Sequence, residues 1–299
     1  MKKIFIVIIS VFGSFQMHAQ GCSDAGFCSV GNSFSDATTT KNQIDVGGII
    51  GAGDADTNIF YFSPYVAYTR NFSDTFSLNA KITYSQADGD FGTKGQFGDA
   101  FLTGNYSFKE KNAKKWSALL GVKLPFTSSN AKINDISLPL DYQASLGTFD
   151  LIAGVGLNYK KWFFNTALQL PVFNNNKNSY FDEYSASNDF PSTNLFKRKP
   201  DVLFRTTYTI NTNKKFTFKP NLLFVYHLGE DTYETIFGNR EAIVGSDGLT
   251  LNGNLITSYA ISPNRSIELS LATPFVVRDI RPDGLTRSFT AGVIYKYAF

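Results

Sequence analysis

The chain contains few of the residues on which enzyme and metal sites depend: two cysteines, two histidines and two tryptophans among 299 residues. His18 lies in an N-terminal segment that we expect to be removed, which leaves His227 as the one histidine of the mature chain. Zinc sites and Ser-His-Asp systems need histidine or cysteine in spatial groups. The sequence therefore predicts that the protein is not an enzyme and that it holds neither a metal nor a cofactor.

Long apolar runs are missing beyond the N-terminus, where no stretch approaches the about 20 residues that a membrane-spanning helix needs. Residues 1–19 combine Lys2 and Lys3, a short apolar run from Ile4 to Phe15, and the small residue Ala19. This pattern is typical of a secretory signal peptide, and we predict cleavage after Ala19. Lipoprotein processing with the lipid on Cys22 is the alternative, although Ala19-Gln20-Gly21 matches a lipobox poorly.

An excess of basic charge is also missing. Removal of residues 1–19 leaves 26 basic against 25 acidic residues. The clustered lysines between Lys109 and Lys115 fit a solvated turn better than a nucleic-acid surface. The sequence therefore predicts no nucleic-acid partner.

Both cysteines fall in residues 20–41, which we predict to form a periplasmic segment ahead of the main domain. Export places Cys22 and Cys28 in an oxidising compartment, where disulfides persist. We expect a small Cys22–Cys28 disulfide loop. Metal binding by the pair is the other possibility, but the sequence places no histidine nearby.

The mature chain is instead rich in aromatic residues, with 15 tyrosines and 29 phenylalanines, and it alternates apolar and polar residues. About 12 segments are long enough to cross a bilayer as tilted strands, which predicts an all-β fold: a transmembrane antiparallel up-and-down β-barrel over residues 42–299. The expected strands are 42–53, 57–71, 75–87, 95–108, 115–127, 147–160, 161–173, 200–212, 215–227, 249–262, 265–277 and 286–299.

The connections between these segments alternate in length, as in barrels with short periplasmic turns and longer external loops. Short turns are expected at 71–74, 109–114, 160–161, 211–214 and 262–265. Longer loops are expected at 86–94, 128–146, 174–199, 229–248 and 278–285, with a short exception near 54–56. The even strand count places both termini on the periplasmic side.

The last strand ends on an aromatic residue at the carboxy-terminus, as outer-membrane barrels do. Its alternation places Tyr295, Tyr297 and Phe299 toward lipid and Lys296 toward the interior. We expect these three aromatic residues to be the signal that the barrel-assembly machinery recognises. Trp116 and Trp162 each follow a short turn and should belong to the periplasmic aromatic girdle.

Inward parity predicts a polar lumen. Its charged lining should consist of Lys81, Asp99, Lys123, Asp150, Arg205, Lys219, Glu268 and Lys296. Two interpretations remain open: an aqueous pore with a weak preference for anions, or charged struts that close a narrow barrel. Counting from the turns places Asp99 opposite residues near 83 and 124, between Lys81 and Lys123.

The loop from Gly229 to Gly248 carries five acids, Glu230, Asp231, Glu234, Glu241 and Asp247, against Arg240. We expect it to be solvated or bridged by cations to lipopolysaccharide. Carboxylates also bind divalent cations, but the spacing matches no calcium loop.

Three short motifs carry a resemblance to a known family: Gly98–Thr103 (GDAFLT), Leu119–Pro125 (LLGVKLP) and Gly147–Gly156 (GTFDLIAGVG). Together with the strand layout they resemble the barrel proteins named for the meta-pathway of phenol degradation. The opening Gly21–Cys28 (GCSDAGFC) is similar to uncharacterised exported barrels of Gram-negative bacteria. The resemblance implies aromatic or fatty solutes.

We therefore expect a protein of the cell outer membrane that contacts the bilayer and lipopolysaccharide. Its expected function is a passive channel or transporter for small polar or amphipathic solutes, aromatic ones included. A non-conducting structural or surface-interaction barrel is the alternative. A barrel enzyme is a minor alternative, because the serine and asparagine of the outer-membrane phospholipase pattern are not found around His227.

Overall fold

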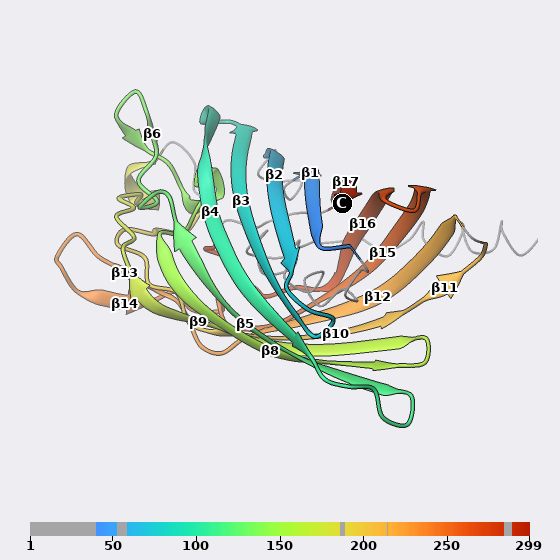
Figure 1. Cartoon of the computed structure of the whole chain (residues 1–299). Helices are drawn as coiled ribbons and strands as arrows, with labels where there is room; N and C mark the ends of the chain where they lie inside the picture. The colour runs from blue at the N-terminus through green and yellow to red at the C-terminus, as the bar shows by residue number, and fades with distance from the viewer. Residues whose placement is uncertain (1–39, 53–58, 186–188, 214, 284–288) are drawn as a thin grey trace, which may run out of the picture.

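The computed structural model describes residues 40–52, 59–185, 189–213, 215–283 and 289–299 (Figure 1). The predicted signal peptide, nearly all of the predicted segment 20–41, and both cysteines lie outside the described residues. The predicted short loop at 54–56 does so too. Among the described residues, none of the helices is long or apolar enough to span a bilayer.

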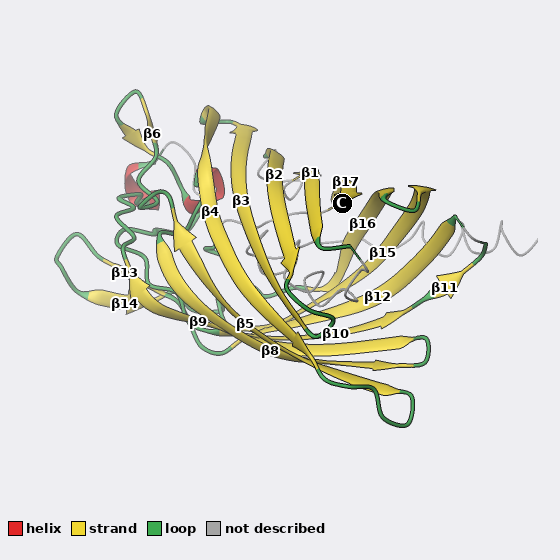
Figure 2. Cartoon of the chain, in the orientation of Figure 1, coloured by secondary structure: helices red, strands yellow, loops and turns green. Residues whose placement is uncertain are grey.

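Antiparallel strands form a closed barrel of 12 strands, in which the short β11 continues β10 (Figure 2). The wall consists of β1 (Asn42–Ala52), β2 (Phe60–Asn71), β3 (Phe76–Gly89), β4 (Gly92–Ser107), β5 (Lys114–Pro125), β8 (Thr148–Tyr159), β9 (Trp162–Asn174), β10 (Asp201–Tyr208) with β11 (Ile210–Asn211), β12 (Phe216–His227), β15 (Gly248–Ser262), β16 (Arg265–Val276) and β17 (Phe289–Ala298). The predicted fold class and the count of about 12 strands are confirmed.

The barrel closes between the first and last strands. β1 pairs with β17 along its length, from Gln43 opposite Ala298 to Ala52 opposite Phe289. Backbone hydrogen bonds continue this seam, since the Asn42 and Phe299 N–H groups donate to each other's carbonyl oxygens at 2.9 and 2.8 Å. Closure leaves the wall formed by the described strands without a free edge, which suits a barrel surrounded by lipid.

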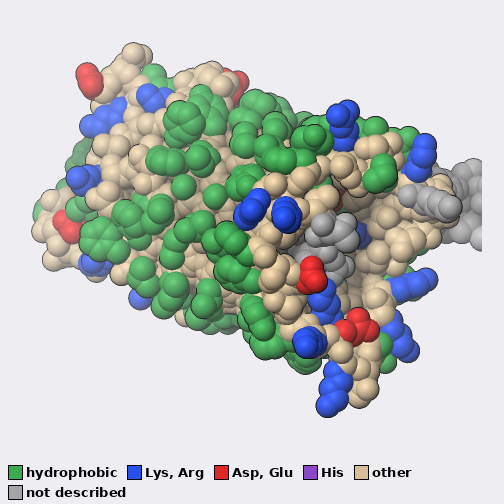
Figure 3. Space-filling model, in the orientation of Figure 1, with side chains coloured by type: hydrophobic (Ala, Val, Ile, Leu, Met, Phe, Trp, Pro, Cys, Tyr) green, Lys and Arg blue, Asp and Glu red, His purple; other side chains and the backbone are tan. Residues whose placement is uncertain are grey.

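Alternation along each strand gives the wall two different faces. Large apolar side chains such as Leu102, Leu120 and Leu222 are exposed on the outer face, while their neighbours in sequence point inward and are buried. Figure 3 shows hydrophobic side chains over most of the visible wall. An exposed apolar band of this extent is unfavourable in water and favourable in hydrocarbon, so the outer face fits a bilayer.

Short turns join the strands at one end, here called the turn end, and most longer connections lie at the other, the loop end. The loop predicted at 86–94 is wrong. β3 and β4 continue through it and are joined by only Asp90 and Phe91. The strands extend because Asp88 and Gly89 still pair with Thr93 and Gly92.

The longer loops carry structure that the alternation did not indicate. The connection between β5 and β8 contains β6 (Lys132–Ile133), β7 (Ile136–Ser137) and the 3-10 helix η1 (Leu140–Tyr142). The connection between β9 and β10 contains η2 (Asp182–Tyr184), and that between β12 and β15 contains the hairpin β13 (Thr232–Glu234) and β14 (Arg240–Ala242).

The barrel lumen as candidate functional site

All eight residues predicted to line the lumen lie on the inner face of the wall. Strand register arranges several of them in one row across seven neighbouring strands. In order, the row reads Asp150, Lys123, Phe101, Lys81, Ala67, Asp45 and Lys296. Asp45 was missed by the sequence reasoning, although its inward parity in the first strand could have identified it.

Lys123 and Asp150 form an ion pair at 2.8 Å in which both side chains are fully buried. They are direct neighbours in register on β5 and β8, on either side of the long loop 126–147. The Gln169 side-chain amide donates a second hydrogen bond to Asp150. The sequence reasoning placed Lys123 beside Asp99 and did not assign Asp150 to it, because register can be counted across a short turn and not across a folded loop.

Asp99 lies where the register was expected, to within one residue. It is opposite Pro125 on β5. On β3, the Thr83 hydroxyl donates to the Asp99 carbonyl oxygen at 3.0 Å and accepts from its N–H at 2.8 Å. The Asp99 carboxylate accepts a hydrogen bond from the Ser145 hydroxyl at 2.6 Å. Asp99 therefore links the wall to the loop between β5 and β8.

Lys81 faces aromatic rings inside the barrel. Its ammonium nitrogen lies 4.1 Å from the centroid of Tyr65 and 5.9 Å from that of Phe101. A cation over the face of a desolvated ring is stabilised by roughly 0.5–2 kcal/mol. The inner wall therefore combines charge with aromatic surface in the centre of the row.

A second charged group lies nearer the turn end. Lys296 on β17 pairs with Glu268 on β16 at 3.0 Å, and Glu268 also accepts from the Ser258 hydroxyl at 3.1 Å. Asp45 is directly opposite Lys296 in register. This group is partly exposed, in contrast to the Lys123–Asp150 pair.

A polar arc crosses the opposite wall. Arg205 on β10 is buried between Asn165 on β9 and Leu223 on β12. The amide groups of Asn165 and Asn252 are buried and have no hydrogen-bond partner among the described residues. Because such groups are costly when unsatisfied, they are suited to binding water or a polar solute.

An apolar band lies next to this polar arc. Seven inward-facing residues form it: Phe101, Leu119, Ile152, Ala167, Leu203, Leu223 and Val225. The lumen is therefore amphipathic rather than uniformly polar. The sequence prediction named only the charged and amide residues, although the same inward parity includes these apolar ones.

Loops pack over the inner wall at the loop end. Inward-facing Tyr61 and Ala87 belong to one buried cluster with loop residues Leu138, Tyr142 and Tyr180. A second cluster joins three loops through Leu140, Leu146, Phe196 and Ile243. These contacts form a roof over part of the loop-end mouth.

Six buried charged residues hold the roof to two strand ends; we call them the loop-end ion network. They are Arg198, Asp201, His227, Asp231, Arg278 and Asp283. They come from β10, β12 and from the loops 175–200, 228–247 and 277–288.

His227 lies at the centre of this network. Its Nδ1 is 2.6 Å from Asp201 and its Nε2 is 2.8 Å from Asp231. Both ring nitrogens are thus engaged by carboxylates, so neither can accept a proton from a serine in this arrangement. This is the geometry of a structural histidine. The sequence placed His227 at a strand end but did not identify its partners.

The two arginines complete the network. Arg278 donates to Asp283 at 2.8 Å and to the Ser246 carbonyl oxygen at 2.6 Å. Arg198 donates to Asp201 and lies 3.8 Å from Asp283. Burial raises the pKa of Asp283, but Arg278 and then Arg198 outweigh it and hold this pKa at about 2. Burial raises the pKa of Asp231 in turn.

Acid should therefore loosen the roof. The pKa of Asp283 is lowered from 3.8 to about 2. Its contribution to the stability of the roof is therefore complete above about pH 4 and is lost as the pH falls toward 2. The shift corresponds to about 2 kcal/mol. We expect pepsin to cut the loops much faster at pH 2 than at pH 4 after correction for its own activity, while the barrel stays heat-modifiable. Equal corrected rates would contradict this assignment.

The acidic loop differs from its expected solvated form. Asp231 is buried in the ion network, and Glu230 accepts from the Gly245 N–H at 3.2 Å. Glu234 is 3.5 Å from Arg240. In the described part of the chain, no group of three or more His, Cys, Asp or Glu residues is placed to hold a metal ion.

The aromatic residues of the turn end lie on the outer face. Trp116 and Trp162 are 50% and 43% exposed. Trp162 contacts Tyr208 with ring centroids 4.8 Å apart. Tyr295 and Tyr297 are exposed on β17 and Phe299 is exposed directly after it, and the rings of the last two stack with their centroids 5.4 Å apart.

Comparison with known proteins agrees with this architecture. No family model and no curated protein sequence matches the chain. Among solved structures, the barrel is similar to the COG4313 outer membrane channel from Pseudomonas putida F1, with a TM-score of 0.62 over 88% of this chain and 97% of that chain, at 12% identity. The chain has the fold of an outer-membrane channel. At this identity the likeness shows the fold alone.

Two other structures are more distant. The NanC porin has a TM-score of 0.47 and 12% identity, over 86% of this chain and 98% of that chain. The CymD monoaromatic hydrocarbon channel has a TM-score of 0.45 and 8% identity, over 87% of this chain and 89% of that chain. Neither likeness is close enough to support a statement about function.

Proposed function

We propose that this protein is a passive channel of the bacterial outer membrane for small polar or amphipathic solutes. The observation that carries the proposal is the closed barrel with an apolar outer face and an amphipathic inner face. A wall of this kind is stable in hydrocarbon and offers a solute both charged groups and an apolar band. The similarity to an outer membrane channel supports the same assignment.

The experiment is single-channel conductance in planar bilayers. We expect discrete openings, with a weak anion preference in a salt gradient. The eight predicted lumen residues together with Asp45 comprise five cations, Lys81, Lys123, Arg205, Lys219 and Lys296, and four acids, Asp45, Asp99, Asp150 and Glu268. A folded, heat-modifiable protein that never conducts would reject the channel.

Swelling of proteoliposomes then compares solutes of equal size. An amphipathic lumen should admit an aromatic alcohol or acid at least as fast as a sugar of similar mass, because the apolar band offers it contact. The family resemblance implies aromatic solutes, and faster swelling with the aromatic compound would support them as substrates of the channel.

A non-conducting barrel is the second candidate, favoured by the packed roof at the loop end. In that case the charged pairs are struts, and the exposed loop surface is the functional part. Removing the roof separates the two candidates. If loop cleavage by a protease raises conductance from zero, the barrel is a closed channel. If the cleaved protein remains silent, the structural role is favoured.

The C-terminal strand is proposed to bind the barrel-assembly machinery. Phe299 is exposed on the outer face, and its backbone closes the seam with Asn42. Deleting Phe299, or the change Phe299→Lys, should leave unfolded protein in the periplasm. Heat-modifiable migration of membrane fractions measures this. Phe72→Lys, at an exposed aromatic residue in a turn, is the control and should assemble normally. If the Phe299 variants also assemble normally, the C-terminal aromatic residue is not the assembly signal.

A further inference from the structure

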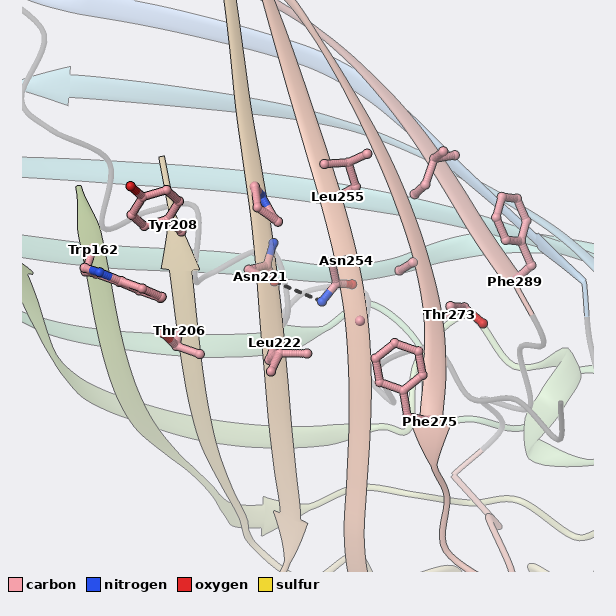
Figure 4. A pocket seen from close by; sticks show the side chains of 14 residues that line it. Trp162, Thr206, Tyr208, Asn221, Leu222, Asn254, Leu255, Thr273, Phe275 and Phe289 are labelled. Atoms are coloured by element: carbon pink, nitrogen blue, oxygen red, sulfur yellow. Dashed lines mark hydrogen bonds between the residues drawn. The ribbon is translucent and has the colours of Figure 1, made fainter. Parts of the chain in front are cut away.

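A groove of about 860 Å³ lies on the outer face of the barrel (Figure 4). It crosses six strands, from Trp162 on β9 to Phe289 on β17. Most of the side chains that line it have outward parity, including Tyr208, Leu222 and Phe275. The groove therefore faces the surroundings of the barrel and not its lumen.

The register explains why the wall is hollowed here. Thr206, Leu222, Gly253 and Thr273 are successive neighbours in one outward-facing row, and three of the four are small. The next row toward the turn end contains larger residues, with Pro220, Leu255 and Leu271 as direct neighbours. A row of small side chains beside a row of large ones leaves a trough in a surface that is otherwise convex.

A β-bulge closes the other side of the trough. Leu251 is opposite Val276 and Asn252 is opposite Pro274, so Phe275 is the extra residue on β16. Its ring lies over Gly253, where a Cβ atom would be 2.4 Å from it. Glycine is required at this position because any side chain would displace the ring that forms the edge of the groove.

The groove has the dimensions of one membrane leaflet. Six strands at a spacing of about 4.8 Å span about 24 Å along the row. With strands tilted by roughly 40°, the row rises by about 15 Å, which is half of a hydrocarbon core of about 30 Å. It begins at Trp162, the first residue of β9 at the turn end, and ends at Phe289 on β17.

Cations lie beside the groove at the turn end. Lys160 and Lys161 form the turn immediately before Trp162, and both are exposed. Lys215 is exposed in the turn before β12, next to the β10 strand that carries Tyr208. The apolar trough thus has a basic rim at one end, where the head group of a lipid in the adjacent leaflet would be.

We propose that the groove binds one phospholipid of the periplasmic leaflet, with an anionic head group at the lysine rim and an acyl chain along the trough. This inference rests on the proposed outer-membrane location and not on conduction. An unfilled trough would leave Gly253, Leu222 and Phe275 without partner atoms on one side, whereas an acyl chain restores that contact. The bound lipid therefore differs from the exchanging lipids on the convex wall.

Native mass spectrometry of the detergent-solubilised protein, exchanged into phosphatidylglycerol or phosphatidylethanolamine, tests the proposal. The wild type should retain one phosphatidylglycerol. Thr206→Trp fills the trough and should reduce retention by about tenfold, a loss of about 1.4 kcal/mol. Ala80→Trp, at an exposed outward position on β3 that does not line the groove, is the matched control and should retain the lipid.

The double variant Lys161→Gln, Lys215→Gln should retain both lipids equally, which separates head-group recognition from acyl-chain binding. A wild type that retains no lipid, or equal retention by Thr206→Trp and Ala80→Trp, would overturn the proposal. Conductance is recorded on the same preparations. A protein that conducts but binds no lipid would reject the groove site and support the channel function. A silent protein that retains lipid would reject the channel function and support the groove site.

Discussion

Replacing Lys123 with methionine should lower the free energy of unfolding by about 3–5 kcal/mol, because it leaves the buried Asp150 carboxylate without its cation. Both side chains of this pair have no exposed surface, and in the variant the Gln169 amide would still donate a hydrogen bond to Asp150. Urea unfolding of the barrel in lipid vesicles, followed by tryptophan fluorescence, measures the change.

Two further variants show that the loss comes from the unpaired charge. Lys123→Met combined with Asp150→Leu removes both charges and should recover most of the stability, since an apolar pair of similar volume often replaces a buried ion pair without loss. Lys109→Met removes an exposed lysine in a turn and should change stability by less than about 0.5 kcal/mol. If Lys123→Met unfolds like the wild type, the pair does not stabilise the wall.

Arg278→Gln should release the roof while the barrel stays closed. The change removes the cation that pairs with Asp283 and holds the Ser246 carbonyl oxygen, and it leaves a buried carboxylate with the more distant Arg198. We expect the stability of the packed loops to fall by about 3–5 kcal/mol, while the stability of the wall stays unchanged. Trypsin should then cut the loops 175–200 and 228–247 in intact membranes, while the barrel remains heat-modifiable.

Arg265→Gln is the control for this variant, because Arg265 lies exposed at the turn end and away from the network. Its loops should resist trypsin as those of the wild type do. Resistance of Arg278→Gln as well would show that the apolar clusters hold the roof without the ion network.

The sequence predicted the wall well because a barrel strand is a local pattern. Apolar and polar residues alternate with the pleat, so the face of Leu120 or Lys123 follows from its neighbours alone. The error at 86–94 has the same origin. Gln86, Asp88 and Gly89 have turn-like composition, but their backbone groups still find partners in β4, and pairing decided the structure.

Whether the sequence predicted the position of a charged residue's partner depended on the connection between the two residues. Asp99 was placed to within one residue because one turn separates β4 from β5. Asp150 was not assigned to Lys123, and Asp201, Asp231 and Asp283 were not assigned to a network. The Lys123–Asp150 pair joins strands on either side of a long loop, and Arg198 and Asp283 come from two different loops. His227–Asp231 and Arg278–Asp283 are close in sequence, but they depend on loop conformations that follow no periodic pattern.

The sequence by itself determined that the chain forms a β-barrel, how many strands it has, which residues face outward and where the chain closes. These properties depend on period-two alternation and on turn lengths, which are local. Only the tertiary structure decided the Lys123–Asp150 pair, the roof with its ion network, and the outer groove. Each of these depends on which residues of different strands and loops become neighbours, and that is fixed by barrel closure and register, which no single segment contains.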